Sequence, residues 1–131
     1  MIQQPLPNKY KKYKILIYFM LESTDKLTPA NKIPKNNIIW KYSNPKKSQK
    51  LAYKYFGKKA TIYRSTKKNK KYMIQDNKGH WVHFGQIPYE DFTKHKNLTR
   101  RHNYLTRSGK IRGDWKKKKY SANNLSRKIL W

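Results

Sequence analysis

The sequence predicts a small α+β domain: an antiparallel β-meander of about three strands, with a basic helix before it, two short helices after it and an extended N-terminal arm. Three observations favour this fold. Turn residues separate three runs rich in β-branched and aromatic residues between positions 60 and 85, which is the pattern of a meander. Capping residues and helical spacing of apolar residues occur on both sides of these runs. The length of 131 residues suits a single domain.

Positive charge dominates the composition. The chain contains 33 Lys and Arg against 6 Asp and Glu, a net charge of +27, and 15% of its residues are aromatic. Residues 41–71 carry +12 and residues 100–131 carry +10, whereas residues 72–99 are neutral. The neutral segment is therefore predicted to build the core, and the basic segments to face a polyanion that relieves their mutual repulsion. The lack of cysteine excludes disulfides, thiolate zinc sites and cysteine nucleophiles.

We expect residues 1–40 to form an N-terminal arm and linker, and residues 41–131 to form the single basic domain. The arm contains one apolar run, Ile15–Leu21, which is far shorter than the roughly 20 residues of a membrane-spanning helix. Basic residues before the run resemble a secretory signal, but Glu22 and Asp25 follow it in place of a small-residue cleavage site. The prediction is a buried strand or a short docking helix, with no membrane span.

The basic helix is expected to run from Pro45 to about Phe56. The Asn44 side chain can accept hydrogen bonds from the free N–H groups at the helix start, and proline is tolerated at the first helical position. Gly57 then supplies the left-handed residue at which many helices end. The side expected to be apolar consists of Leu51, Ala52, Tyr55 and Phe56, with the lysines pointing elsewhere.

The three strands of the meander are predicted at Ala60–Ser65, Lys71–Asp76 and His80–Gly85. Alternation places Val82 and Phe84 on one face of the sheet, and Trp81 and His83 on the other. One of these faces is expected to pack under the basic helix.

Two helices are predicted after Pro88, where the spacing of apolar residues changes. Asn97 can cap a helix over Leu98–Arg107, in which Leu98, His102 and Leu105 form one stripe. Ser121 can cap a closing helix that turns Leu125 and Ile129 inward.

Catalytic and metal sites find little support in the sequence. His80 and His83 are close in sequence, but strand alternation sends them to opposite faces, so structural histidines are predicted in place of a zinc site. Asp91 and His95 are one helical turn apart, yet the second carboxylate cluster of a metal-dependent phosphoryl site is lacking. We expect Asp91 to cap a turn and His95 to pack against Tyr89. No enzymatic activity, cofactor, metal or small-molecule substrate is therefore expected.

Clusters of cations beside aromatic residues are the candidate binding site. Such an arrangement pairs neutralisation of phosphates with rings that stack on bases. The predicted contacts to nucleic acid or another polyanion are Lys67, Lys68, Lys70, Lys71, Arg100, Arg101, Arg107, Lys116, Lys117, Lys118 and Lys119, flanked by Tyr63, Tyr72, Trp115 and Tyr120. No helix-turn-helix or zinc-finger motif occurs, so binding without sequence readout is expected.

A family resemblance rests on residue types that recur in order. They are Phe84-Gly85, Tyr89, Asp91-Phe92-Thr93, His95-Lys96, Arg100-Arg101, Tyr104-Leu105, Arg107, Gly113-Asp114-Trp115 and Leu130-Trp131. Over residues 58–131 the chain resembles a family of small basic proteins of giant (nucleocytoplasmic large) DNA viruses. The resemblance implies a component of the virion or of its assembly, without a settled biochemical activity.

The expected function is thus a non-enzymatic structural component of a large double-stranded DNA virus particle, as a minor capsid or internal cementing protein. It would bind other virion proteins and nucleic-acid phosphates through its basic faces, in the virion and in the host cytoplasm during assembly. One alternative is a sequence-independent nucleic-acid-binding protein, acting in genome condensation or in a ribosome-like RNA assembly. An enzyme using Asp91 and His95 is a second alternative, and it requires these side chains to meet at the wall of a cleft.

Overall fold

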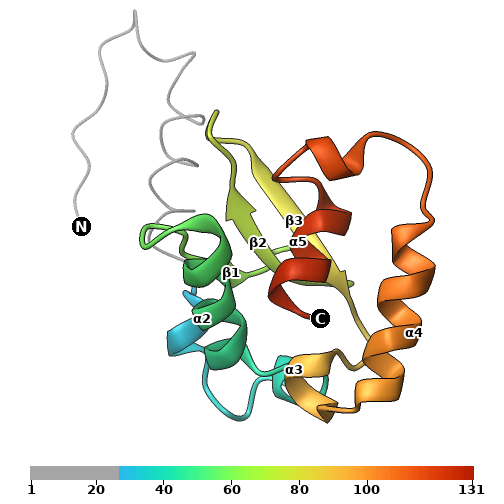
Figure 1. Cartoon of the computed structure of the whole chain (residues 1–131). Helices are drawn as coiled ribbons and strands as arrows, with labels where there is room; N and C mark the ends of the chain where they lie inside the picture. Colours follow the sequence, from blue (N-terminus) through green and yellow to red (C-terminus); the bar gives the residue numbers. More distant parts are fainter. Residues whose placement is uncertain (1–26) are drawn as a thin grey trace, which may run out of the picture.

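A three-stranded antiparallel sheet in the order β1–β2–β3 forms the centre of the computed structural model, which describes residues 27–131 (Figure 1). The strands are β1 (Tyr63–Arg64), β2 (Lys70–Gln75) and β3 (Trp81–Gln86). The α-helices are α2 (Pro45–Phe56), α3 (Phe92–His95), α4 (Leu98–Gly109) and α5 (Ala122–Ile129), with short 3₁₀ helices η2 (Ala30–Lys32), η3 (Ile38–Lys41) and η4 (Trp115–Lys117). The α+β class and the meander are confirmed. The apolar run Ile15–Leu21 and the rest of residues 1–26 of the predicted arm and linker lie outside the described residues.

The first strand is shorter than predicted because other groups take its backbone hydrogen bonds. The Gln49 side chain of α2 donates to the Ala60 carbonyl at 2.7 Å and accepts from the Ile62 N–H at 2.9 Å. On the outer edge, the Ala30 N–H donates to the Ile62 carbonyl at 2.9 Å. Residues 60–62 are therefore bound to α2 and to η2.

Side-chain alternation in the sheet agrees with the prediction. Tyr72 lies opposite Phe84, and Met73 lies opposite His83. Tyr72 and Phe84 are fully buried on the core face, whereas Trp81 on the other face is exposed. The period-two pattern of β3 was enough to assign its faces.

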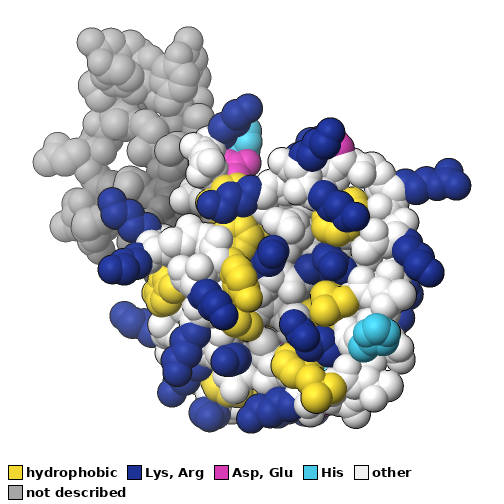
Figure 2. Space-filling model, in the orientation of Figure 1, with side chains coloured by type: hydrophobic (Ala, Val, Ile, Leu, Met, Phe, Trp, Pro, Cys, Tyr) yellow, Lys and Arg dark blue, Asp and Glu magenta, His cyan; other side chains and the backbone are white. Residues whose placement is uncertain are grey.

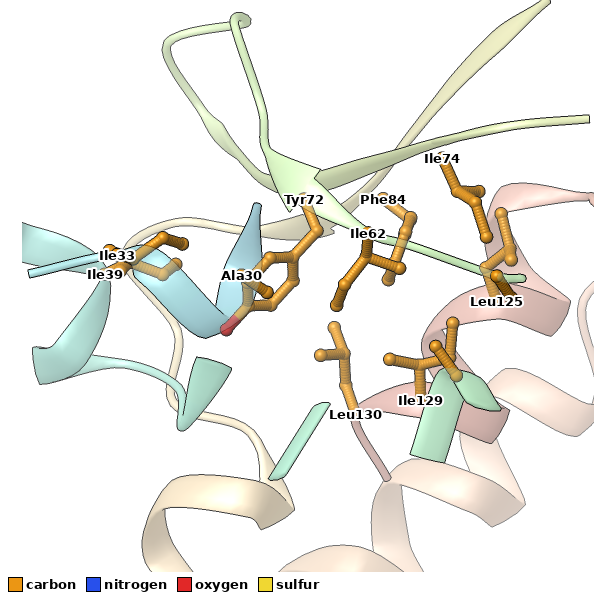
Figure 3. Close-up of a cluster of buried hydrophobic side chains, with 12 residues drawn as sticks. Ala30, Ile33, Ile39, Ile62, Tyr72, Ile74, Phe84, Leu125, Ile129 and Leu130 are labelled. Carbon is orange, nitrogen blue, oxygen red and sulfur yellow. The ribbon is translucent and has the colours of Figure 1, made fainter. Parts of the chain in front are cut away.

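Residues of the C-terminal helix form much of the core against the sheet (Figure 3). α5 packs directly on β3, with Leu125, Ile129 and Leu130 almost completely buried. α2 packs against α5 and η2 and contributes Ala52 to the core. The sheet is thus covered mainly by α5, and the Ser121 cap with the inward Leu125 and Ile129 is confirmed.

The folded unit also includes residues that the sequence assigned to a linker. Ala30, Ile33 and Ile39 belong to the hydrophobic core, and each is at most 5% exposed. The Trp40 indole N–H donates to the Ile33 carbonyl at 3.3 Å, which closes this segment on itself.

The ends of α2 are as predicted, but its buried side is not. Asn44 accepts from the Lys47 N–H, Pro45 begins the helix and Gly57 follows it with a φ of +104°. The buried residues are Pro45, Ser48, Gln49 and Ala52, whereas Tyr55 is 44% exposed. The prediction that Tyr55 lies on a core-facing side is wrong, because the helix turns toward the backbone groups that Gln49 binds.

For α4, too, the prediction of the first residues is correct and the prediction of the buried face is not. The Asn97 cap is confirmed, since its side chain accepts from the Arg100 N–H at 2.9 Å. The predicted inward stripe is wrong: Leu98 is 72% exposed and His102 is exposed. The side toward α5 carries Tyr104 and Ser108 instead, because Arg127 of α5 binds Ser108 and Trp131, just after α5, stacks on Tyr104.

Over residues 27–131, every helix is too short or too polar to cross a membrane.

Candidate nucleic-acid interface

One of the predicted contacts, Lys71, is buried in an ion pair. Its side chain is 3% exposed, and its ammonium lies 3.1 Å from the Asp91 carboxylate, which is fully buried. Burial lowers the pKa of Lys71, while Asp91 acts in the opposite direction. Asp91 takes the N-cap position of α3, in line with the predicted turn cap, but its side chain makes no capping hydrogen bond. Lys71 therefore serves the fold and does not face solvent.

A chain of buried hydroxyl groups continues from this ion pair. The Thr93 hydroxyl donates to Asp91, and its oxygen accepts from the Asn44 N–H at 2.9 Å. Ser43 lies 3.2 Å from Thr93 and accepts from the Tyr72 hydroxyl at 2.7 Å. Burial raises the pKa of Tyr72. These bonds join the strand β2 to the start of α2 and to α3.

The predicted neighbour of His95 is also wrong. Its ring packs against Phe92 and Trp131, with centroids 6.0 and 5.2 Å apart, while Tyr89 points to solvent and is 67% exposed. The hydrogen bonds of the Asp91 and His95 side chains go to different partners. Within residues 27–131, no three His, Cys, Asp or Glu side chains lie close enough together to hold a metal ion.

Three of the predicted cations meet in a groove between the sheet and α4. Lys70 comes from β2, and Arg100 and Arg107 come from α4. This groove, named the β3–α4 groove, has a volume of about 620 Å³. Its lining residues are Lys70, Lys71, Phe84, Gly85, Gln86, Tyr89, Glu90, Arg100, Asn103, Tyr104, Arg107, Ala122, Asn123, Ser126, Leu130 and Trp131.

Aromatic rings lie among the cations of the groove. Tyr104 stacks on Trp131 with centroids 4.2 Å apart and an angle of 10° between the rings. The Arg107 guanidinium lies 5.8 Å from the Tyr104 ring, and burial raises the pKa of Tyr104. Tyr89 at the rim leaves most of its ring in solvent. The groove thus combines cations for phosphates with a ring exposed for stacking.

The other predicted contacts lie outside this groove. Lys67 and Lys68 are exposed in the turn between β1 and β2. Arg101 faces another side of α4, where its Nε donates to the main-chain oxygen of Trp131 at 2.5 Å. The exposed Lys116, Lys117, Lys118 and Lys119 lie on and after η4, where Lys116 approaches Trp115 and Lys119 approaches Phe56.

All four acids of the described chain already have a positively charged partner or a histidine beside them. The pairs are Asp76 with His80, Glu90 with Arg100, Asp91 with Lys71 and Asp114 with Lys118. Figure 2 shows dark-blue Lys and Arg side chains over the whole visible face, with acids only near its upper edge. Most cations between residues 27 and 131 therefore lack a carboxylate partner within that part of the chain.

Sequence reasoning missed Tyr89, Asn103 and Tyr104 as residues of the groove. The spacing of Arg100, Asn103, Tyr104 and Arg107 contained a usable signal, because residues three, four and seven apart share one helix face. The apolar stripe through Leu98 drew the prediction to a different face.

Acidification is expected to destabilise the fold through His83 and His95. Burial is the main cause that lowers the pKa of each imidazole below 6.5, and nearby cations add to it. The unfolded chain therefore binds these protons at a higher pH than the folded chain does. The free energy of unfolding should fall as the pH drops from about 6.5 through the folded-state pKa values. Urea denaturation at a series of pH values measures this, and His83→Gln should weaken the dependence. A fold that gains stability over the same range would contradict the expectation.

Comparison with known proteins gives one match. A family model described as a family of unknown function (DUF5754) matches residues 60–108, so the chain is similar to that family from before β1 through most of α4. The matched part contains the sheet and all four cations that line the β3–α4 groove: Lys70, Lys71, Arg100 and Arg107. No curated protein and no solved structure matches the chain.

Proposed function

We propose that the protein is a non-enzymatic nucleic-acid-binding protein that contacts phosphates without reading sequence. The observation that carries the proposal is the meeting of Lys70, Arg100 and Arg107 around one groove with an exposed tyrosine at its rim. These cations come from segments about 30 residues apart in sequence, so the fold brings them together. Neutralised phosphates release counterions, and this release supplies most of the affinity of such proteins.

The charges outside the groove support the same proposal. Lys67 and Lys68 extend the basic surface next to Lys70 along the chain, and Lys116–Lys119 adds another exposed cluster. With a net charge of +27, the protein gains affinity for any polyanion. Contacts of this kind fix position on the nucleic acid and carry no sequence information.

Removal of the two groove arginines tests the proposal. Arg100→Ala/Arg107→Ala should weaken binding to a labelled oligonucleotide by about tenfold and reduce the salt dependence by about two phosphate contacts. Fluorescence anisotropy at several salt concentrations measures both quantities. The matched control is Lys110→Ala/Arg112→Ala, which removes the same charge at exposed positions outside the groove.

Two results would contradict the proposal. Equal losses in the two double variants would mean that the groove is not the site and that only net charge matters. Affinity that ignored salt, or that differed strongly between oligonucleotides of unrelated sequence, would remove phosphate contact as the basis of binding.

A second proposal concerns the setting in which the protein acts. The resemblance over residues 58–131 supports a structural role in the particle of a large double-stranded DNA virus, where the basic faces hold nucleic acid or acidic virion proteins. Quantitative mass spectrometry of purified particles tests this. Enrichment in particles over infected-cell lysate is the expected result, and abundance in cells with absence from particles would refute it.

A further inference from the structure

A second groove lies between α2 and α4 and is distinct from the proposed nucleic-acid site. This α2–α4 groove has a volume of about 670 Å³, and α3 and α5 complete its walls. Its lining combines apolar and aromatic side chains with five cations, and it includes no Asp or Glu. Figure 2 shows the face where α2, α5 and α4 lie, with yellow apolar side chains between dark-blue cations.

The apolar lining contains two residues from the predicted apolar side of α2. Leu51 and Tyr55 both line the groove, together with Leu105 from α4. Leu51 and Leu105 are only partly buried, and Tyr55 is 44% exposed. Apolar residues at helical spacing that remain accessible in a groove are typical of a site for another apolar surface.

The cations of the groove divide into two kinds. Two arginines hold the walls together: Arg127 donates to the Leu105 carbonyl at 2.7 Å and to the Ser108 hydroxyl at 2.6 Å, and Arg101 donates to the Trp131 main-chain oxygen. The exposed lysines are Lys47, Lys96 and Lys128, one from α2, one just after α3 and one from α5. These lysines line the same groove as the apolar residues and can receive carboxylates.

We propose that the α2–α4 groove is the docking site for an acidic amphipathic helix of a partner protein. Apolar side chains on one face of such a helix would contact Leu51, Tyr55 and Leu105, and its Glu and Asp residues would meet the surrounding lysines. Leu51 and Leu105 can contact the apolar side chains of such a helix, whereas they offer a base neither a stacking ring nor a hydrogen-bonding group. The proposal adds a protein partner to the nucleic-acid contacts of the β3–α4 groove and does not depend on them.

A designed peptide tests the proposal on the full chain. The probe is a fluorescein-labelled synthetic helix with Leu at every third or fourth position and Glu between, and a second peptide has Ser in place of Leu. We expect saturable binding of the first peptide and at least about tenfold weaker binding of the second, because Ser removes the apolar contacts. Fluorescence anisotropy measures both affinities.

Matched variants locate the site. Lys47→Glu/Lys128→Glu should weaken binding of the Leu–Glu peptide by at least about tenfold, and Lys46→Glu/Lys50→Glu, with the same charge change at exposed positions outside the groove, by no more than about threefold. Tyr55→Ala should weaken it about fivefold or more, whereas the exposed Tyr53→Ala should leave it unchanged. Equal thermal unfolding temperatures show that the variants are folded.

The same measurements distinguish the alternative ligands of the α2–α4 groove. No binding, or equal losses in the matched variants, would overturn the proposal. An oligonucleotide that loses affinity through Tyr55→Ala and Lys47→Glu/Lys128→Glu would assign the groove to nucleic acid. Peptide binding that appears only when charged residues replace Ile15 and Ile17 would assign it to the apolar run of this chain.

Discussion

Asp91→Ala is expected to lower the free energy of unfolding by about 3–5 kcal/mol, because it leaves the buried Lys71 ammonium without its counter-ion. The two charged groups lie 3.1 Å apart, and both side chains are almost completely shielded from water. The change also removes the acceptor of the Thr93 hydroxyl, whose oxygen binds the Asn44 N–H at the start of α2. Urea denaturation followed by tryptophan fluorescence measures the loss.

A double variant separates the contribution of the ion pair to stability from the contribution of the packing around it. Lys71→Met/Asp91→Leu should recover most of the stability lost in Asp91→Ala, since apolar residues of similar size often replace a buried ion pair at little cost. The exposed pair of Asp114 and Lys118 provides the surface control, and Asp114→Ala should change stability by less than about 1 kcal/mol. If the double variant were as unstable as Asp91→Ala, the loss would come from packing and not from an unpaired charge.

The burial of Lys71 marks the limit of prediction from a charge pattern. Lys70 and Lys71 are neighbours in a basic run, and the sequence treats them alike. Both lysines line the β3–α4 groove, but Lys70 remains partly exposed whereas Lys71 is buried against Asp91, which lies 20 residues later in the chain. Only the path of the chain between β3 and α3 decides which lysine meets the acid.

Local rules, in contrast, predicted correctly where α2, α4 and α5 begin. Asn44, Asn97 and Ser121 each accept a backbone N–H within the first turn, and such a bond depends on no other part of the chain. The face that a helix buries depends on its neighbour. Tyr55 and Leu98 are exposed because the neighbouring elements offer polar partners to other faces of α2 and α4.

Polar and aromatic contacts, more than apolar packing, hold α4 to the rest of the domain. Tyr104 stacks on Trp131, and Arg127 of α5 binds the Leu105 carbonyl and the Ser108 hydroxyl. The β3–α4 groove lies on one side of α4 and the α2–α4 groove on another, and Trp131 lines both. Two binding surfaces of different chemistry can therefore share one helix, with Arg100 and Arg107 on one and Leu105 on the other.

Gly85→Ala is the second change with a large expected effect, at about 2–5 kcal/mol of lost stability. Gly85 in β3 has a φ of +81°, which costs a residue with a Cβ about 1–2 kcal/mol. An added Cβ would also lie 2.9 Å from the Lys71 Cβ and from Leu130 Cδ1. Crowding of this kind in a packed interior typically costs about 1–3 kcal/mol. Urea denaturation of the variant measures the sum.

Gly79→Ala separates the cost of the backbone conformation from the cost of crowding. Gly79 has a nearly identical φ of +82°, but there is open space where a Cβ would be. Its loss should be limited to the conformational cost of about 1–2 kcal/mol. A larger loss at Gly85 than at Gly79 would show that close approach of β3 to Lys71 and Leu130 requires a glycine there. Equal losses would show that these neighbours can move aside. Because Gly85 and Leu130 both line the β3–α4 groove, the crowded variant should also bind the oligonucleotide more weakly, while Gly79→Ala should bind it normally.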